Sequence, residues 1–376
     1  MMRTLCGKQG GKQGARRRRT QSRSQRGAAL ITALLVMTLA AVLVSGLLWR
    51  EQVEIRRVEN QRQAQQARWV SRGGFDWTRL ILRSEADSSP QTYLGGVWSV
   101  PIAETRLSDF IGKLGAAREE QGASTWLSGS IEDAQAKFNL RNLVSTSGAG
   151  SDALSVDPVA LAQFQKLLSL LGFNGQLAVS AAVQMRSSLM YSATRVQHAD
   201  TGNPASAMQA GVGGSGSGDT PGLSGQDDNR AQRPLPIHSL DALLDVPGFT
   251  PEIVARLRPF VTMLPVPSQI NLNTAGPEVI AASIPSLPLS GAQGFIGARD
   301  QSFIVDLAQA ESQLSRFAPN IEGLDQARFD VTTRFFMVHG RVRHERAIVD
   351  RVALIYRDPR THGTHIIEVR DASSAD

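Results

Sequence analysis

Residues 28–49 read AALITALLVMTLAAVLVSGLLW, a run of 22 residues without a charged side chain. About 20 such residues are enough for a helix to cross the hydrocarbon core of a bilayer. The hydroxyl groups of Thr32, Thr38 and Ser45 can bond to the helix backbone and so do not forbid insertion. A signal for signal peptidase would be shorter and would end in small residues before a cut. The run therefore predicts a membrane-spanning helix that is retained.

The charge of the chain is concentrated in front of this helix. Residues 1–27 hold nine basic residues and no acidic one, which leaves 31 basic and 34 acidic residues in the remainder. A basic segment before an apolar helix stays on the cytoplasmic side. We prefer this interpretation to a nucleic-acid-binding or nuclear-import patch. The only cysteine, Cys6, lies in the same segment, so the body has no disulfide and no thiolate site.

The apolar run continues into a second helical pattern. Residues 50–72 are rich in Glu, Gln, Arg and Ala, which favour helix, and no proline occurs between residues 50 and 89. Small or apolar residues recur at intervals of three and four, which predicts one stripe on the helix. The stripe consists of Ala64, Ala67, Ser71, Phe75, Thr78 and Leu82. We expect a single helix from about Ala28 to about Leu82, with Gly73-Gly74 as its weak point.

The basic leader, Arg26-Gly27 and the long helix together resemble the N-terminus of type IV pilins and pseudopilins. The resemblance implies that prepilin peptidase cuts after Gly27 and methylates the new terminus, Ala28. Most pilins carry glutamate at the fifth mature position, where this chain has Thr32. The K-type minor pseudopilins of the type II secretion system characteristically lack that glutamate. The resemblance therefore implies a position at the filament tip, with Thr32 as the residue that determines it.

Two later segments predict strands. Residues 126–140 read WLSGSIEDAQAKFNL, which is typical of a strand, an acidic turn and a second strand. Any β-hairpin with a polar turn could give this pattern, but the segment resembles the K-type Phe-Asn-Leu run at Phe138, Asn139 and Leu140. Residues 327–356 alternate with period two. We expect them to return to a sheet that begins near Trp98, followed by a polar tail.

Residues 237–320 resemble helix-hairpin-helix units. One is formed by Ile237–Phe249 with the helix that follows, and a second begins at Ile270–Ala275. In DNA-binding proteins such hairpins hold a phosphate with backbone amides, so a membrane-anchored periplasmic DNA-binding protein is the alternative function. This segment has seven acidic and four basic residues, a poor composition for binding phosphate. In K-type pseudopilins such repeats are structural, and we prefer that interpretation.

The predicted fold class is α+β: a pilin-like long N-terminal helix packed on a small antiparallel sheet, with a large inserted all-α domain containing helix-hairpin-helix-like repeats. The expected divisions are a cleaved leader (1–27), a transmembrane helix (28–49), its periplasmic extension (50–86), the first part of the pilin domain (87–143), the helical insert (144–320, with a flexible loop at 199–233), the C-terminal strands (321–358) and the polar tail (359–376).

The sequence offers no catalytic constellation: it has no HExxH pair and no GxSxG elbow. We therefore expect no enzyme activity, no small-molecule substrate and no cofactor. K-type relatives often bind calcium through an acidic loop, but here residues 190–230 supply only Asp200, Asp219, Asp227 and Asp228. No calcium site is assigned.

The resemblance implies a minor pseudopilin that initiates or caps the periplasmic pseudopilus, which drives folded proteins across the outer membrane of a Gram-negative bacterium. The expected location is the inner membrane, with the N-terminus in the cytoplasm. The implied partners are the I- and J-type minor pseudopilins, prepilin peptidase and the inner-membrane secretion platform, without nucleic acid. We expect Ala64, Ala67, Ser71 and Phe75 to pack against the partner helices.

Overall fold

The computed structural model describes residues 22–113, 124–146, 154–200, 239–318, 321 and 323–372. The chain divides into two units, Met1–Gln63 and Ala64–Asp376. The first helix, α1 (Ser22–Ser88), begins in the first unit and ends in the second. It is longer at both ends than the sequence predicts, and Gly73-Gly74 does not interrupt it. No proline occurs within it to remove a backbone donor.

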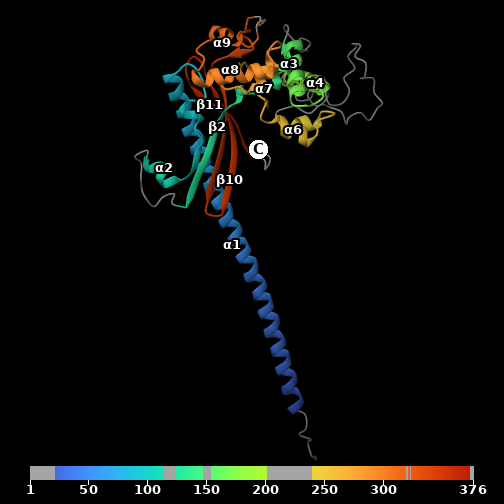
Figure 1. Ribbon diagram of the computed structural model, residues 1–376. Helices are drawn as coiled ribbons and strands as arrows, with labels where there is room; N and C mark the ends of the chain where they lie inside the picture. Colours follow the sequence, from blue (N-terminus) through green and yellow to red (C-terminus); the bar gives the residue numbers. More distant parts are fainter. Residues whose placement is uncertain are drawn as a thin grey trace, which may run out of the picture. The chain divides into compact units, whose positions relative to one another are not determined.

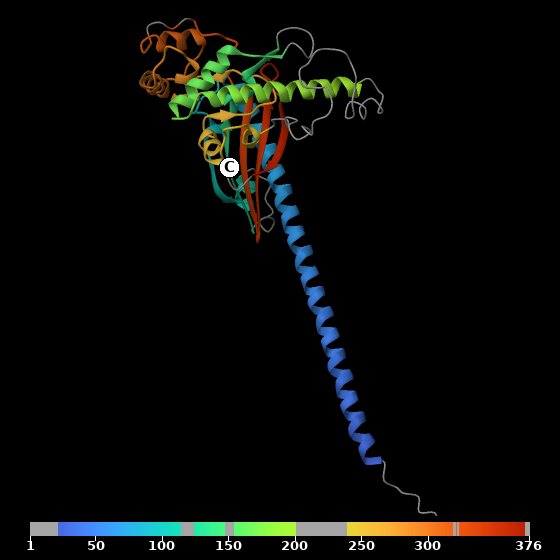
Figure 2. The ribbon, with the colours of Figure 1, turned by 90° about the vertical axis from the view of Figure 1, so that its right-hand side faces the viewer.

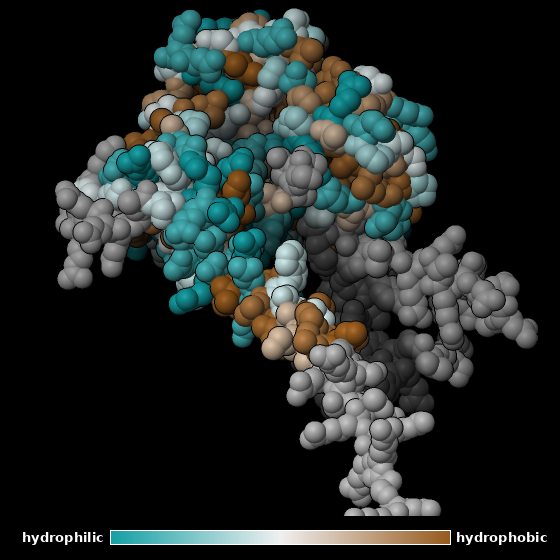
Figure 3. Space-filling model, turned by 90° about the horizontal axis from the view of Figure 1, so that it is seen from below, coloured by the Kyte–Doolittle hydropathy of each residue, from teal (hydrophilic) through white to brown (hydrophobic). Residues whose placement is uncertain are grey.

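In the first unit, the apolar side chains of α1 are exposed. Leu34, Met37 and Leu43 are between 56% and 72% exposed. The end of α1 that points toward the viewer in Figure 3 is largely brown, the colour of hydrophobic residues. This stretch is long and apolar enough to cross a membrane, and none of it is buried within the protein. A helix that is apolar on all sides is stable in lipid.

The second unit contains a five-stranded antiparallel sheet in the order β1-β2-β9-β10-β11 (Figure 1). Its strands are β1 (Ile102–Arg106), β2 (Thr125–Asp133), β9 (Phe335–His344), β10 (Ala347–Arg357) and β11 (Thr364–Asp371). A short helix, α2 (Leu107–Lys113), follows β1. The second half of α1 covers one face, where Phe75 and Leu82 are buried with Phe336 and Val338 of β9. Gly340 leaves the space that Phe75 fills, because a Cβ there would lie 3.2 Å from its ring.

One expectation about this sheet is wrong. The predicted polar tail, 359–376, contains β11, which pairs with β10 from Arg351↔Asp371 to Arg357↔Thr364. An edge strand with one exposed face needs few apolar residues, so its sequence looks like a tail. The sheet begins near Trp98, as predicted: Trp98 lies in a 3₁₀ turn, η1 (Val97–Ser99), and β1 starts four residues after it.

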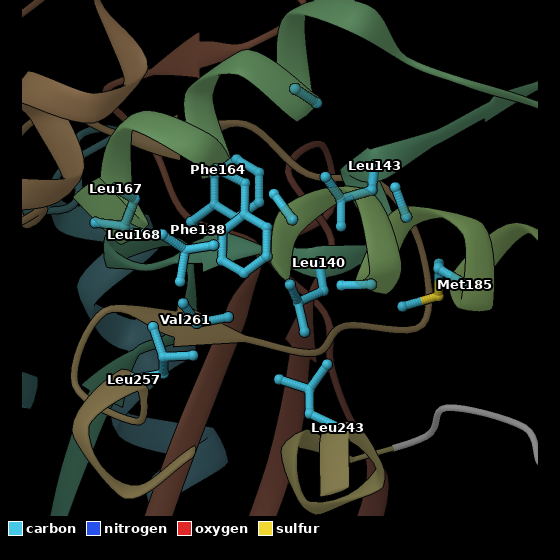
Figure 4. Packing of buried hydrophobic residues seen from close by; sticks show 14 of the residues in the cluster. Phe138, Leu140, Leu143, Phe164, Leu167, Leu168, Met185, Leu243, Leu257 and Val261 are labelled. Carbon is cyan, nitrogen blue, oxygen red and sulfur yellow. The ribbon is translucent and has the colours of Figure 1, made fainter. Parts of the chain in front are cut away.

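The helical insert lies between β2 and β9 in the chain, and its helices gather at one end of the sheet in both Figure 1 and Figure 2. Its helices are α3 (Pro158–Leu170), α4 (Gln176–Asp200), η6 (Leu240–Asp245), α6 (Pro251–Leu257), α7 (Pro277–Ser283), α8 (Leu289–Gln301) and α9 (Leu307–Leu314). One core surrounds the stacked rings of Phe138 and Phe164, whose centroids are 5.4 Å apart (Figure 4). A second core surrounds Phe295 and Ile280.

The sequence predicts an all-α insert, but the insert also contains strands. The described residues include short strands: β3 (Phe138–Asn139) pairs in parallel with β6 (Val261–Thr262), β4 (Val144–Thr146) pairs with β5 (Leu154–Val156), and β7 (Ile270–Asn271) pairs in parallel with β8 (Phe329–Asp330). Strands of two or three residues leave no periodic signal in a sequence. Through these pairs the segments on either side of the insert become part of its two cores.

Candidate functional site at the junction of sheet and insert

Asp133, the last residue of β2, lies at the centre of the junction between the sheet and the insert. Its side chain is 2% exposed. One oxygen, Oδ1, accepts from the backbone N–H of Gln135 at 2.7 Å and so caps the 3₁₀ turn η2 (Ala134–Ala136). The other, Oδ2, accepts from Thr274 Oγ1 at 2.6 Å, Thr333 Oγ1 at 2.6 Å and Asn271 Nδ2 at 2.9 Å. A single carboxylate therefore connects β2, the insert and the segment before β9.

Asn271 extends this connection to the segment that follows α1. Its Nδ2 also donates to the carbonyl of Thr92 at 3.0 Å and to Thr333 Oγ1 at 2.8 Å. Its Oδ1 accepts from the backbone N–H of Asn273, which keeps the turn before α7 closed. Buried polar groups must be paired in this way, since an unpaired one costs about 1–3 kcal/mol.

Arg357, near the end of β10, adds a buried positive charge to the network. Its Nη2 donates to Thr92 Oγ1 at 2.7 Å and to the Thr333 carbonyl at 2.9 Å, and its Nη1 donates to the Leu82 carbonyl at 3.3 Å. The guanidinium also lies 4.8 Å from the ring centre of Phe336. Through Leu82, α1 joins the same network as the sheet and the insert.

The ionisation of this pair follows from its burial. Burial raises the pKa of the Asp133 carboxyl, although its four hydrogen-bond donors favour the charged form. For the guanidinium of Arg357 the same burial acts in the other direction and lowers the pKa, while the attraction of Asp133 raises it. A guanidinium still remains protonated in proteins. Asp133 and Arg357 are therefore two buried groups of opposite charge type that are joined through Thr333, whose hydroxyl donates to Asp133 and whose carbonyl accepts from Arg357.

The Phe138-Asn139-Leu140 segment lies beside this junction. Phe138 and Leu140 are 1% and 0% exposed in the core of the insert. Asn139 Oδ1 accepts from the backbone N–H of Arg141 and Leu264, and its Nδ2 donates to the Val266 carbonyl at 2.9 Å. The segment that carries the resemblance in the sequence thus contains β3, the strand that leads into the insert and joins its first core.

The turn at Asn271–Ala275 does not have the free amides that a phosphate would need. Its backbone N–H groups at Asn273, Thr274 and Ala275 all donate to Asn271. The carbonyls of Leu272 and Ala275 accept from the buried Arg299. The carboxylate of Asp133, which accepts from Thr274 in this turn, is acidic and would repel a phosphate. This geometry disfavours the DNA-binding alternative for the second predicted hairpin.

Metal binding finds no support among the side chains that the structure describes. No group of three or more His, Cys, Asp or Glu residues is arranged there to hold an ion. The acidic residues considered for calcium, Asp200, Asp219, Asp227 and Asp228, have side chains outside the described part of the chain.

The predicted partner stripe on α1 is buried in the chain itself. Ala67, Ser71 and Phe75 are 0%, 2% and 2% exposed. Ala67 packs with Leu127 of β2 and Val342 of β9. The prediction that these three residues contact partner helices is therefore wrong, because the chain's own sheet covers them. Ala64, one turn earlier, is half-buried.

The residues predicted for processing lie at the start of α1. Gly27 and Ala28 are within its helical backbone, and the side chain of Ala28 is outside the described residues. Thr32 Oγ1 donates to the carbonyl of Ala29 at 3.0 Å, so its hydroxyl is bonded within the helix, as a hydroxyl in lipid requires.

The sequence alone did not identify the residues that join the two halves: Asp133, Asn271, Thr274, Thr333 and Arg357. Asp133 lies in the acidic turn of residues 126–140, and Asn271 and Thr274 lie in the INLNTA stretch of the second hairpin. The available signal was their polarity within apolar segments, since a polar residue between core positions needs a partner. Nothing in the sequence shows that they are partners of one another.

Comparison with known proteins agrees with this architecture. Residues 136–266 and 270–332, more than half of the chain, match two sequence profiles described as "Type II secretion system (T2SS), protein K". Type II secretion system protein K of Pseudomonas aeruginosa is 27% identical over 329 residues, which is 84% of each chain. The protein of the same name from Pectobacterium carotovorum is 25% identical over 343 residues, 86% of this chain and 92% of that one.

A solved structure shares the fold. A chain of the GspK-GspI-GspJ complex from the enterotoxigenic Escherichia coli type 2 secretion system matches with a TM-score of 0.55 and 18% identity, over 85% of this chain and 100% of that chain. The likeness confirms the predicted class of a long N-terminal helix on a small antiparallel sheet with a helical insert. The chain therefore belongs to the family of type II secretion system protein K, whose members are minor pseudopilins of that system.

Proposed function

We propose that this chain initiates or caps the periplasmic pseudopilus and occupies its tip. The observation that carries the proposal is the position of the insert at the C-terminal end of α1. Directly after the helix, Gln91 Nε2 donates to the Val305 carbonyl at 3.2 Å, and Tyr93 stacks on Phe303 with centroids 4.4 Å apart. A further subunit stacked beyond that end of α1 would meet the insert. This favours one copy per filament, at the tip.

Thr32 supports the same position. A glutamate at this place would be costly in lipid unless it were paired with a neighbouring terminal amine. The hydroxyl of Thr32 is bonded to the Ala29 carbonyl of its own helix and needs no neighbour. A subunit without that carboxylate forms no such pair with a subunit ahead of it.

The proposal includes the processing and location implied by the N-terminus. Prepilin peptidase cuts after Gly27 at the cytoplasmic face and methylates Ala28, and the body from Ala64 onward lies in the periplasm of a Gram-negative cell. Nine basic residues before the apolar run support this orientation. The proposed partners are the I- and J-type minor pseudopilins, as in the solved relative, together with the peptidase and the inner-membrane secretion platform.

Deletion and overexpression test this function. A strain lacking the gene should retain its exoproteins in the periplasm, and the full-length gene should restore secretion. Overexpression should shorten or suppress pseudopili by capping them early. Mass spectrometry of the membrane form should show an N-terminus at Ala28. A Gly27→Leu variant is the control, and it should keep its leader. Long filaments labelled along their whole length by antibody to this chain would refute the tip position.

A further inference from the structure

The turn between α3 and α4 contains Asn174-Gly175, the only Asn-Gly pair in the sequence. The backbone nitrogen that follows an asparagine can attack the amide carbon of its side chain, which closes a succinimide ring. Glycine hinders this attack least, because it has no Cβ and its backbone rotates most freely. Asn174 is exposed and Gly175 is half-buried, so water reaches the pair. The turn therefore has the residues and the solvent access that loss of the side-chain amide requires.

The attacking nitrogen is not held by the fold. The next two N–H groups are bonded, from Leu177 to the Asn174 carbonyl at 3.2 Å and from Ala178 to the Gly175 carbonyl at 3.1 Å. The N–H of Gly175 makes no hydrogen bond among the residues that the structure describes. The first N–H groups of a helix have no partner within the helix, which accounts for this. Attack by Gly175 N thus breaks no existing bond of that nitrogen.

The side chain of Asn174 is bonded at one end only. Its Oδ1 accepts from the backbone N–H of Gln176 at 2.9 Å and so caps α4. Within the described part of the chain, the leaving group Nδ2 has no partner. Ring closure needs a rotation of the Asn174 backbone that breaks the cap bond. Loss of one exposed hydrogen bond should slow the reaction about two- to tenfold relative to the unfolded chain. The cap therefore slows the attack without preventing it.

The turn has room for this rotation. A Cβ placed on Gly175 would lie 3.6 Å from the Gln165 carbonyl oxygen and 3.7 Å from Ser169 Oγ, which are ordinary contact distances. The φ angle of Gly175 also lies outside the left-handed range. Alanine at this position therefore fits the folded chain, and Gly175→Ala changes the reactivity of the pair without straining the turn.

The asparagines at the borders of the insert and in its second hairpin are protected in comparison. Each bonds through both its side-chain oxygen and its side-chain nitrogen, and each is followed by Leu or Thr. They are Asn139, Asn142, Asn271 and Asn273. Three of them are also at most 2% exposed. Rotation at these positions would break several buried bonds, each costly to lose.

We propose that Asn174 is a modification site at which this chain deamidates through a succinimide formed with Gly175. The Gly175 nitrogen forms a bond to Cγ of Asn174, the bond from Cγ to Nδ2 breaks, and the displaced proton leaves with Nδ2 as ammonia. Water then opens the ring at one of its two carbonyls, which gives aspartate or isoaspartate. The reaction consumes only water and needs no oxidant or cofactor.

The two products affect α4 differently. Aspartate keeps the capping oxygen and adds a negative charge at the N-terminus of the helix, where the helix dipole favours it. Isoaspartate lengthens the backbone by one carbon and moves the capping group away from Gln176. The helix contributes Ala178, Ala181 and Met185 to the first core of the insert. The isoaspartate form should therefore unfold at a lower temperature than the aspartate form.

The test follows the full chain in detergent during incubation at neutral and mildly alkaline pH. Trypsin releases residues 167–186 as one peptide, and electron-transfer fragmentation distinguishes the two products at position 174. Both products should accumulate, and faster at the higher pH, because the attacking nitrogen must lose its proton. Gly175→Ala is the matched control and should slow the conversion about tenfold. Peptides that contain Asn139, Asn271 or Asn273 should remain unmodified over the same period.

Two further measurements examine the role of the turn. The wild-type chain in urea should convert about two- to tenfold faster than the folded chain, since the cap bond to Gln176 is lost. Asn174→Asp reproduces the aspartate product and should melt at the wild-type temperature or above it. The aged wild-type sample should contain an additional fraction that melts lower and carries isoaspartate.

Three results would overturn the assignment. One is an unmodified Asn174 in the folded chain after the urea sample has been converted completely. A second is equal conversion of wild type and Gly175→Ala, which would indicate direct hydrolysis instead of attack by the Gly175 nitrogen. The third is earlier conversion of another asparagine, which would show that the Asn-Gly turn is not the reactive position.

Discussion

Asp133→Asn replaces one carboxylate oxygen by an amide nitrogen at the junction of sheet and insert. The remaining Oδ1 can still accept from the backbone N–H of Gln135, which is 2.7 Å away. The new amide takes the place of Oδ2, where three groups now donate. The hydroxyls of Thr274 and Thr333 can rotate and become acceptors. The Nδ2 of Asn271 cannot, so two amide groups oppose each other.

The expected magnitude follows from these contacts. Two hydrogen bonds to a charged acceptor, worth about 1.5–3 kcal/mol each, become neutral bonds worth about 0.5–1.5 kcal/mol. Asn271 Nδ2 keeps the Thr92 carbonyl and Thr333 Oγ1 as acceptors, but it loses its bond to residue 133 and faces a second N–H₂ group, which costs about 1–3 kcal/mol. Removing the charge recovers part of the desolvation cost that raises the pKa of Asp133. We expect a net loss of about 2–4 kcal/mol in the free energy of unfolding.

Guanidinium unfolding of the full chain in detergent, followed by circular dichroism, measures this loss. Asp330→Asn is the matched control, because among the described residues the carboxylate of Asp330 accepts only from Val331 and Thr332 next to it in the chain. The control should lose less than about 1 kcal/mol, since only local bonds change. If Asp133→Asn loses no more than Asp330→Asn, the junction does not depend on this carboxylate and the reasoning fails.

Three further predictions concern α1 and the insert. Ala67→Glu should lower the thermal stability of the chain itself, since Ala67 is fully buried against Val342, and an unchanged melting temperature would contradict that packing. Burial would raise the pKa of Asp157, but hydrogen bonds and Arg328 lower it below the ordinary value of 3.8. Asp157 therefore stabilises the fold above about pH 3.8, and this stabilisation is lost as the pH falls through the lower pKa that Asp157 has in the folded protein. Asp157→Asn keeps the N-cap of α3 but should flatten the acid limb of the stability curve, and an unaltered limb would count against the ion pair. Thr32→Glu should not produce long filaments in electron micrographs, because the insert still blocks stacking; filaments made of this variant would show that Thr32 alone sets the tip position.

The sequence by itself determined the elements whose signal is local. An uncharged run of 22 residues can only be a buried or membrane helix of this length, whatever the rest of the chain does. The period-two pattern of residues 327–356 was enough to predict strands there, and the structure contains β9 and β10. The edge strand β11 was not recognisable, because one exposed face gives it the composition of a tail.

Only the tertiary structure decided what those elements contact. Helical periodicity in Ala67, Ser71 and Phe75 shows that one face of α1 is buried, but a period does not identify the surface that buries it. That surface is the chain's own sheet. Asp133 and Arg357 are 224 residues apart and reach one network because β2, β9 and β10 lie side by side. Their pairing depends on burial and on a shared partner, Thr333, and neither property is encoded in the neighbouring residues of either side chain.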